Sequence, residues 1–433
     1  MPFEQSSAAP RKIAVIGGGI SGMGAAHLLA GNAMVTLFEA APRLGGHART
    51  VMAGKRGDQP VDTGFIVFNR ANYPHLVKLF ETLNVPVAES EMSFGVSMDG
   101  GRFEYGLQGL GSVFAQASNL ARPQFLAMVR DIFRFNANAE RVARPGMTIR
   151  DLLEALGTGR WFRDCYLLPF SGAIWSTPTT DILDFPADAM IRFFKNHALL
   201  SHKGQHQWYT VEGGSQEYVT RLERSLRARG VQIRLGAEVP AVQRDVLGVR
   251  VKSASHHWEG YDEVIFATHS DDTLRLLSDA NEIERAALGA VKYQPNTATL
   301  HRDASVMPKR KKCWASWVYT EDKGQTRDEI GLTYWMNALQ PIPKNDPHFV
   351  TLNGARPIRE ELIYDQATFS HPVYTRAAIE AQDVIRAING AYNTWFCGAW
   401  MKNGFHEDGL ASAVDVANAI AVKDSGALAV AAE

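Results

Sequence analysis

The sequence of 433 residues has few of the features that mark a specialised class of protein. Its cysteines, Cys165, Cys313 and Cys397, stand far apart, so the paired spacing of a zinc site and the dense spacing of a disulfide framework are both missing. The 45 basic and 46 acidic residues nearly cancel, which gives no electrostatic reason to expect nucleic acid as a partner. We therefore expect a globular protein with buried thiols, no metal site and no nucleic-acid partner.

Long apolar segments are also missing. No run approaches the roughly 18 apolar residues that a membrane-spanning helix needs. Residues 1–10 have neither the basic nor the apolar part of a secretion signal, and their composition is typical of a disordered leader. We therefore expect a cytoplasmic protein, free or bound to the inner surface of the membrane. A chain of 433 residues exceeds one ordinary core and predicts two domains.

The amino-terminal stretch carries the clearest pattern in the chain. Residues 12–16 are mainly apolar, as in a buried parallel strand, and residues 23–30 have the composition of a helix. Glycines stand between them at the three positions of a dinucleotide-binding turn, Gly17, Gly19 and Gly22. The first glycine permits a sharp turn, the second lets the backbone approach a pyrophosphate, and the third lets the helix pack closely on the strand.

The other parts of a dinucleotide site follow this turn. Ile20 and Ser21 open the helix, whose first N–H groups bind phosphate without a charged side chain. A second apolar run, residues 34–38, ends in Glu39, which lies twenty residues after Gly19. A carboxylate at this distance binds both ribose hydroxyls and repels the additional phosphate of NADP. Strand, turn, helix and acid together predict a dinucleotide cofactor.

A second glycine pair narrows the choice of cofactor. Residues 43–47 read Arg-Leu-Gly-Gly-His and follow the ribose acid closely. With that acid, the segment resembles the extended FAD fingerprint of the flavin amine oxidase superfamily, which includes monoamine and polyamine oxidases, protoporphyrinogen oxidase, phytoene desaturases and some fatty-acid isomerases. The resemblance implies non-covalently bound FAD, with its pyrophosphate and ribityl chain along Arg43, Gly45 and Gly46. His47 stands where many members have arginine.

The same resemblance implies FAD contacts further along the chain. Gly64 corresponds to a glycine that passes close to the isoalloxazine ring, while an ordinary strand over residues 62–69 is an equal alternative. Residues 216–229 predict a helix that begins after a glycine pair, and the next strand leads to Val239. By analogy the backbone of Val239 contacts adenine. A structural strand–helix unit without a ligand is the alternative.

The closing segment of the chain implies the last group of FAD contacts. They are Gly398, Asp408, Gly409 and Leu410, in a strand, a loop and the start of a helix. Members of the superfamily usually have glutamate directly after the strand glycine, whereas Ala399 stands here. Either Glu407 or Asp408 is therefore expected to take over that task, and the helix N-terminus would stabilise negative charge on the reduced flavin.

This resemblance implies an α/β fold (α+β overall), in which a Rossmann-like FAD-binding domain of the glutathione-reductase type is interleaved with a substrate-binding domain of mixed sheet and helices. The expected FAD-binding domain comprises residues 1–70, 208–290 and 390–433, and the substrate-binding domain comprises residues 71–207 and 291–389. A helical subdomain is expected over about residues 108–200. The β-branched and aromatic residues between 295 and 385 predict the sheet of the substrate domain.

Two segments of the helical subdomain mix apolar and basic residues. Residues 123–142 place apolar side chains on one helical face with arginines among them, and residues 190–200 have a similar mixture. Such a helix either lies on a membrane surface or packs against the core with solvated arginines. Either segment would also suit the wall of a pocket for a long apolar ligand.

The reaction is indicated less directly. Amine oxidases of this superfamily commonly have a lysine beside the flavin, but residues 295–301 contain none and Lys292 lies too early. The chain more closely resembles a bacterial subgroup of NAD/FAD-binding oxidoreductases. Its members are associated with enzymes that methylate unsaturated acyl chains and include a fatty-acyl desaturase of furan fatty acid biosynthesis. The stretches that carry this resemblance are residues 68–74, 92–97, 192–197, 332–337 and 404–409.

The subgroup implies desaturation of a fatty-acyl chain, with hydride transfer from carbon to flavin N5 in a dry apolar channel. His197, His371 and His406 are candidate bases for the accompanying proton, although a single histidine more often has a structural role. A flavin amine oxidase is the second hypothesis, and a fatty-acid isomerase or a non-catalytic flavin-binding protein are further alternatives. The expected partner is an apolar small molecule or an acyl lipid, with peripheral contact to a membrane.

Overall fold

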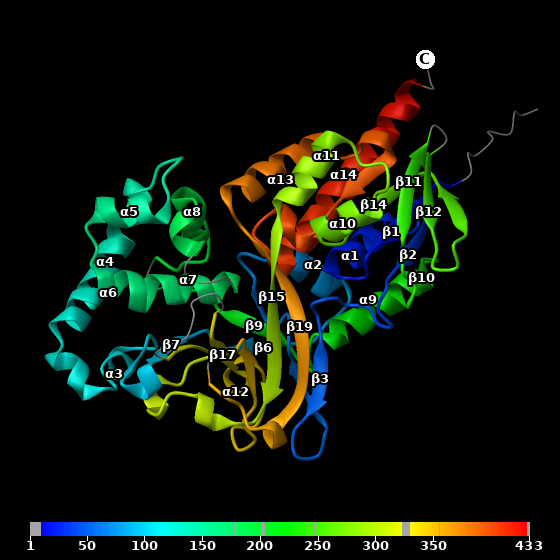
Figure 1. Cartoon of the computed structure of the whole chain (residues 1–433). Helices are drawn as coiled ribbons and strands as arrows, with labels where there is room; N and C mark the ends of the chain where they lie inside the picture. The colour runs from blue at the N-terminus through cyan, green and yellow to red at the C-terminus, as the bar shows by residue number, and fades with distance from the viewer. Residues whose placement is uncertain are drawn as a thin grey trace, which may run out of the picture.

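The computed structural model describes residues 10–176, 179, 181–200, 204–245, 248–322, 330–354 and 356–430. Nearly all of the leader predicted for residues 1–10 lies outside these ranges. Two large sheets organise the described chain, one parallel with five strands and one mixed with seven. Figure 1 shows a group of helices on the left, the parallel sheet with its helices on the right, and long strands between them. The predicted mixture of sheets and helices is confirmed.

The parallel sheet is built from three distant parts of the chain. In spatial order its strands are β10 (Gln232–Arg234), β2 (Met34–Phe38), β1 (Lys12–Ile16), β14 (Glu263–Phe266) and β20 (Thr394–Phe396). All neighbouring strands are parallel, so their carboxyl ends meet at one edge of the sheet. The amino-terminal and closing segments are thereby brought to the same edge, as parallel α/β sheets do at their ligand sites.

Side-chain alternation along β1 explains why both faces of this sheet are covered. Ile13 and Val15 belong to one buried cluster, and Ala14 and Ile16 belong to another. Elements that contribute to the first cluster include α1 (Ile20–Leu29), α2 (Pro74–Thr82), α9 (Gln216–Ala228) and α14 (His406–Val430). Elements that contribute to the second include α10 (Ser270–Leu276), α11 (Glu282–Ala290), α13 (Arg376–Ile388) and strands β11 (Ala241–Asp245), β12 (Gly248–Lys252) and β13 (Trp258–Tyr261).

The mixed sheet is built from two segments of the chain. One lies between β2 and β10 in sequence, and the other lies between β14 and β20. Its spatial order is β19 (Ile363–Val373), β15 (Lys292–His301), β18 (Phe349–Leu352), β17 (Leu332–Trp335), β16 (Trp317–Glu321), β7 (Phe94–Met98) and β8 (Phe103–Gly106). The sheet predicted for residues 295–385 is confirmed only as far as Val373. The later residues form α13, because Thr375 caps the helix by accepting from the N–H of Ala378.

Smaller sheets flank the two large ones. They are the pair β3 (Thr50–Ala53) and β4 (Gln59–Asp62), and the triplet β5 (Val67–Asn69), β9 (Trp208–Val211) and β6 (Val87–Ser90). The strand expected over residues 62–69 is therefore wrong in its middle part. Residues 63–66 turn because Gly64 lies directly against the loop before β3, where an added Cβ would lie only 1.9 Å from the carbonyl oxygen of His47.

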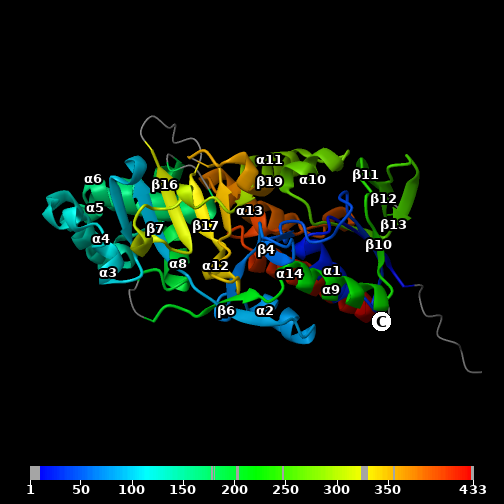
Figure 2. The ribbon, with the colours of Figure 1, turned by 90° about the horizontal axis from the view of Figure 1, so that it is seen from below.

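The helical block contains α3 (Leu110–Val113), α4 (Pro123–Val142), α5 (Ile149–Leu156), α6 (Arg160–Phe162), α7 (Leu168–Trp175) and α8 (Ala187–Asn196), while α12 (Met336–Leu339) lies near the mixed sheet. The bounds predicted for α4 are confirmed, with Pro123 at the first helical position. Figure 2 shows this block and the β11–β13 sheet at opposite ends of the molecule. Within the described ranges, no helix combines the length and the hydrophobicity needed to cross a membrane.

Helices α1 and α14 approach each other very closely. A Cβ added to Gly409 of α14 would lie 2.8 Å from Ser21 Oγ, and one added to Gly24 of α1 would lie 2.5 Å from Leu410 Cδ1. Figure 2 shows α1, α9 and α14 side by side. Glycine at these positions therefore sets the distance between the two helices.

Replacing Gly409 with alanine should destabilise the protein. The new methyl group would force α14 away from Ser21, and we expect the free energy of unfolding to fall by about 1–2 kcal/mol although alanine favours helix. Gly289→Ala in α11 is the matched control, because its methyl group would meet Leu274 at an ordinary 3.7 Å. Urea unfolding should show no loss of stability for this control. Equal effects of the two substitutions would contradict the close helix contact.

Candidate functional site

The glycine turn after β1 leaves its backbone open on one side. Gly17 has a φ of +108°, and an added Cβ would lie 2.7 Å from the carbonyl oxygen of Ala267 at the end of β14. No atom lies within 4 Å of the Cβ position of Gly19, which is the N-cap of α1. The first intrahelical bond is donated by Met23, so the N–H groups before it face away from the helix without such partners. This turn can accommodate a phosphate group.

Glu39 lies against the turn and is held by two backbone N–H groups. Its Oε2 accepts from Gly18 at 2.6 Å, and its Oε1 accepts from Ala41 at 2.7 Å. An added Cβ on Gly18 would lie 2.8 Å from Oε2 and 2.6 Å from Leu44 Cδ2. The turn thus needs glycine at Gly18 as well, a position that the three-glycine pattern leaves free.

The loop of residues 43–47 packs on this turn. The N–H of Gly45 donates to the carbonyl of Gly18, and a Cβ on Gly46 would lie 3.1 Å from Gly19 Cα. The guanidinium of Arg43 donates to the carbonyls of Leu44, Gly46 and Ala48. Arg43 therefore fixes the shape of the loop, a task that its position in the sequence did not indicate.

The segment that follows β10 joins the same region from another part of the chain. The N–H of Ala237 donates to the carbonyl of Glu39, and the N–H of Gly236 donates to the carbonyl of Ala41. Val239 is buried in the cluster that contains Phe38. The structure therefore places the segment that leads to Val239 beside Glu39.

The closing segment completes the site. The N–H of Gly398 donates to Ser412 Oγ, and the indole of Trp400 donates to the carbonyl of Thr268, which follows β14. Gly409 and Leu410 lie in the first turn of α14 against α1. Residues 17–22, 43–47 and 398–410 thus surround one edge of the parallel sheet and are called the cradle below.

Two acids stand at the start of α14, and their surroundings differ. Both oxygens of Glu407 are engaged, because they accept from the N–H groups of His75 and Leu76 at the start of α2. In Asp408, Oδ2 accepts from the N–H groups of Asn403 and Phe405, while Oδ1 has no hydrogen-bond partner among the described residues. Burial raises the pKa of Asp408 to about 6, which still leaves it mainly ionised at pH 7. Asp408 is therefore the acid that retains an oxygen for a ligand.

Histidines gather beside the cradle. The ring of His47 lies 5.9 Å from that of His269, 5.6 Å from that of His371 and 5.1 Å from that of Phe369. Burial lowers the pKa of His47 well below its usual value, and the neighbouring histidines lower it further. These rings are therefore neutral at pH 7 and present hydrogen-bonding groups without charge.

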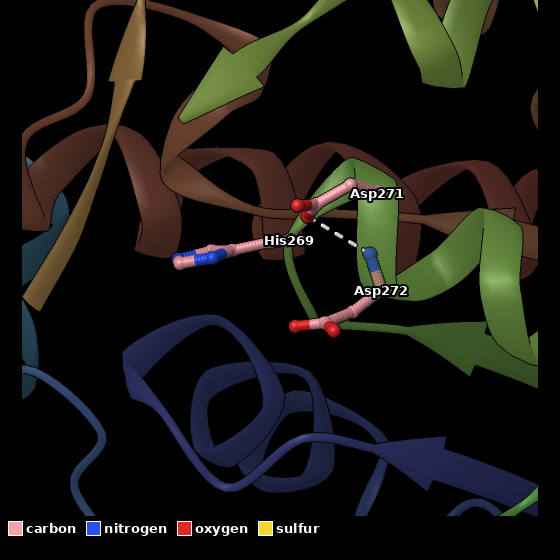
Figure 3. Close-up of side chains that lie close together, drawn as sticks. All are labelled: His269, Asp271 and Asp272. Atoms are coloured by element: carbon pink, nitrogen blue, oxygen red, sulfur yellow. Dashed lines mark hydrogen bonds between the residues drawn. The ribbon is translucent and has the colours of Figure 1, made fainter. Parts of the chain in front are cut away.

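Figure 3 shows His269 with Asp271 and Asp272 at the start of α10, above the β1–α1 turn. One ligand atom from each lies within 4.8 Å of the others, a spacing that suits a metal ion. The ring of His269 also stacks on Tyr293 at 4.3 Å, and Asp271 Oδ1 accepts from the N–H of Asp272. Acids in a first helical turn stabilise the helix dipole. The cluster is thus accounted for by the helix start.

His406 is half-buried at the start of α14. Its Nε2 lies 2.6 Å from the hydroxyl of Tyr218, and its ring stacks on Phe65 at 3.9 Å. Burial lowers its pKa to about 3. Of the three candidate bases, His406 therefore has the clearest structural task, which is to join α14 to α9 and to the turn that contains Gly64.

His197 lies at the end of α8 in a different setting. Its Nδ1 lies 3.0 Å from the carbonyl oxygen of Phe193, so this nitrogen carries the hydrogen and Nε2 keeps its lone pair. The ring stacks on Phe193 at 3.9 Å and lies 6.0 Å from the ring of Phe405, which belongs to the cradle. His197 is thus a proton acceptor in an aromatic environment.

Aromatic side chains extend from the cradle into the helical block. Phe405 stacks on Phe193 at 5.1 Å, and Phe193 lies 4.9 Å from Trp175. Trp175 and Tyr374 line a cavity of 190 Å³ between the helical block and the start of α13. The Tyr374 hydroxyl is buried and has no hydrogen-bond partner in the part of the chain described. The three contacting rings are apolar, whereas the cavity at their end is also lined by Asp184 and Arg376.

Replacing His406 with phenylalanine should remove part of the acid sensitivity of the fold. Because the pKa of His406 is lowered from its usual 6.5 to about 3, its contribution to stability is complete above pH 6.5 and is lost as the pH falls. At pH 5 this loss amounts to about 2 kcal/mol. We expect His406→Phe to be less stable than wild type at pH 7, since Tyr218 loses its partner, and the difference to narrow by about that amount at pH 5. A difference in urea unfolding that is independent of pH would contradict this.

Solved structures with the same fold are numerous, whereas no curated protein matches the sequence. A CLA-producing fatty acid isomerase from P. acnes has a TM-score of 0.67 and 15% identity, over 94% of this chain and 98% of that chain. Cyclohexylamine oxidase from Brevibacterium oxydans has a TM-score of 0.70 and 14% identity, over 96% and 100% of the two chains. A putrescine oxidase bound to putrescine has a TM-score of 0.69 and 14% identity, over 95% and 99%. At these identities the likeness establishes the fold alone.

The family is established by sequence. A sequence model of the flavin-containing amine oxidoreductases matches residues 20–298, from the first turn of α1 into β15. The cradle fits the expected cofactor, because the Gly19 backbone is open and Glu39 lies next to it. The cofactor is FAD, bound non-covalently, and the protein is an FAD-dependent oxidoreductase. The chain belongs to the family of flavin-containing amine oxidoreductases.

Proposed function

We propose that this FAD-dependent oxidoreductase desaturates a fatty-acyl chain. The observation that carries the proposal is the series of aromatic contacts from Phe405 through Phe193 to Trp175, which leads from the cradle to a cavity lined by aromatic rings and also by Asp184 and Arg376. Such a path suits an extended apolar ligand, because apolar surface gains free energy when it leaves water. When bound, FAD supplies the acceptor for a hydride that leaves a carbon atom of the substrate.

Each segment of the cradle would hold a different part of FAD. Glu39 would bind the ribose hydroxyls, and the backbone of Val239 would contact adenine. The N–H groups of Ile20, Ser21 and Gly22 would bind the pyrophosphate, and the loop of Arg43, Gly45, Gly46 and His47 would lie along it. Gly64, Gly398, Asp408, Gly409 and Leu410 would enclose the remaining part, with the α14 dipole favouring negative charge there.

A division of the chain follows from these assignments. The FAD-binding domain would comprise residues 1–70, 208–290 and 390–433, which include all strands of the parallel sheet. The substrate-binding domain would comprise residues 71–207 and 291–389, which include the helical block and the mixed sheet. The substrate path would then run between the two.

Amine oxidation is less well supported by the residues present. Lys292 is exposed and donates to the carbonyl of Gly289, so it faces away from the cradle. Among the described residues no lysine is buried. The mixed sheet instead contributes His371 and Asn296, which are neutral, beside the cradle. A substrate without a charged amine agrees better with these surroundings.

Removal of two hydrogens from neighbouring carbons needs a base as well as a hydride acceptor. His197 is the candidate that suits this task, because its Nε2 has a lone pair and its ring stacks on the aromatic path. One carbon of the chain would lose a proton to Nε2, the neighbouring carbon would lose a hydride, and the remaining electron pair would form the new double bond. Burial lowers the pKa of His197, so the ring is neutral at pH 7 and able to accept a proton.

Anaerobic reduction of the loaded protein distinguishes the candidate reactions. Monounsaturated fatty acids, free or within phospholipid vesicles, should bleach the flavin absorbance, whereas alkyl amines of matched chain length should not. Mass spectrometry of the extracted lipid should then show the loss of two hydrogens. Bleaching by amines alone would overturn the proposal in favour of an amine oxidase. A rearranged lipid of unchanged mass would overturn it in favour of an isomerase.

Substitution of His197 tests its role in this reaction. We expect His197→Gln to slow flavin reduction by acyl substrate by about 10²–10⁴-fold, because glutamine cannot take a proton. Its affinity for FAD should stay close to that of wild type, since His197 lies outside the glycine turn. His257→Gln is the control, because that residue is exposed between β12 and β13. A rate within twofold of wild type for His197→Gln would exclude this base.

A further inference from the structure

Asn296 has a fixed orientation in the mixed sheet. Its side chain is fully buried on β15, and its Nδ2 lies 3.2 Å from the carbonyl oxygen of Ser176 and 3.3 Å from that of Gln294. Carbonyl oxygens only accept hydrogen bonds, so the amide nitrogen must be on this side. On the other side, Oδ1 accepts from Asn353 Nδ2 at 2.6 Å. Three independent partners therefore agree on the direction of the amide.

This orientation decides the tautomer of His371. Asn296 Nδ2 lies 2.8 Å from His371 Nδ1, and because the amide nitrogen is a donor, Nδ1 must accept. A neutral imidazole that accepts at Nδ1 carries its hydrogen on Nε2. Burial, with His269 as a neighbour, lowers the pKa of His371 to about 4, so the ring is neutral at pH 7.

The free nitrogen of His371 lies at the edge of the cradle. In the described ranges no residue accepts a hydrogen bond from Nε2. The ring lies 5.6 Å from that of His47, while Phe369, two residues earlier on β19, lies 3.5 Å from the Cβ position of Gly64. His371 therefore offers one N–H group, without a partner, on the side of the mixed sheet that faces His47 and Gly64.

We propose that His371 is a hydrogen-bond donor to an acceptor atom of the bound flavin, and that Asn296 is the positioning residue that holds it in this state. A base needs a lone pair on the nitrogen that faces the reactants, and the contact with Asn296 places a hydrogen there instead. A fixed donor stabilises negative charge that develops on its acceptor, since it needs no reorganisation during the reaction. The inference rests on FAD occupying the cradle and assigns the base and the donor to different histidines.

The tautomer can be measured without any substrate. In the FAD-loaded protein labelled with ¹⁵N-histidine, long-range ¹H–¹⁵N spectra at pH 7 should show His371 with its hydrogen on Nε2, the signal being assigned by its loss in His371→Gln. In Asn296→Asp the carboxylate accepts from the ring, so the hydrogen should move to Nδ1 or a second proton should be taken up. Asn353→Ser is the control and should keep the tautomer, because the carbonyls of Ser176 and Gln294 still orient the amide. A wild-type signal with hydrogen on Nδ1 would overturn the proposal.

Kinetics separates a donor from a base. Glutamine offers an N–H group and leucine does not, so flavin reduction should slow by less than about tenfold in His371→Gln and by about 100-fold in His371→Leu. The flavin midpoint potential, measured by dye-linked reduction, should be lower in His371→Leu than in His371→Gln. Equal losses of rate in both variants with unchanged potentials would overturn the proposal. If no acyl substrate reduces the flavin, the proposed reaction fails, while the tautomer and the potentials still decide the role of His371.

Discussion

The close contact between α1 and α14 is the constraint on which the site depends. Gly409 and Gly24 allow the two helices to approach until Ser21 and Leu410 fill the space between them. Both helices begin at the same edge of the parallel sheet, so their N-termini carry partial positive charge toward one region. An anionic dinucleotide gains from both dipoles only if the helices are this close. In the proposed FAD site we therefore expect this helix packing to contribute more to cofactor binding than charged side chains do.

A buried carboxylate connects this arrangement with the mixed sheet. Asp62 accepts from Thr50 Oγ1, from the N–H and the hydroxyl of Ser215, and from Gln340 Nε2. Burial raises its pKa to about 6, so ionisation costs free energy, and the surrounding donors offset only part of that cost. Its partners come from β3, the start of α9 and the end of α12. Asp62 thus fixes β3, the start of α9 and the end of α12 relative to one another, at some cost in the free energy of unfolding.

Local patterns in the sequence predicted the turn, the two helices that flank the site and the strands of the parallel sheet, because short-range sterics determine them. The requirement for glycine at Gly18 could not be predicted in this way, since it arises only when Glu39 and Leu44 fold back on the turn. The break at Gly64 has the same origin, because the carbonyl of His47 takes the space that a straight strand would occupy. Asn296 was missed entirely, because an isolated asparagine in a strand gives no periodic signal.

The candidate histidines show most clearly what the sequence alone could not predict. In sequence His197, His371 and His406 are equivalent, and the structure separates them by what contacts one ring nitrogen. A backbone carbonyl at Nδ1 of His197 leaves a lone pair on Nε2, whereas a side-chain amide at Nδ1 of His371 leaves a hydrogen there. The side chain of His406 contacts the Tyr218 hydroxyl through Nε2 and stacks on the ring of Phe65. Since the partners lie 4, 75 and 188 residues away, only the folded chain can assign acceptor, donor and structural roles to the same residue type.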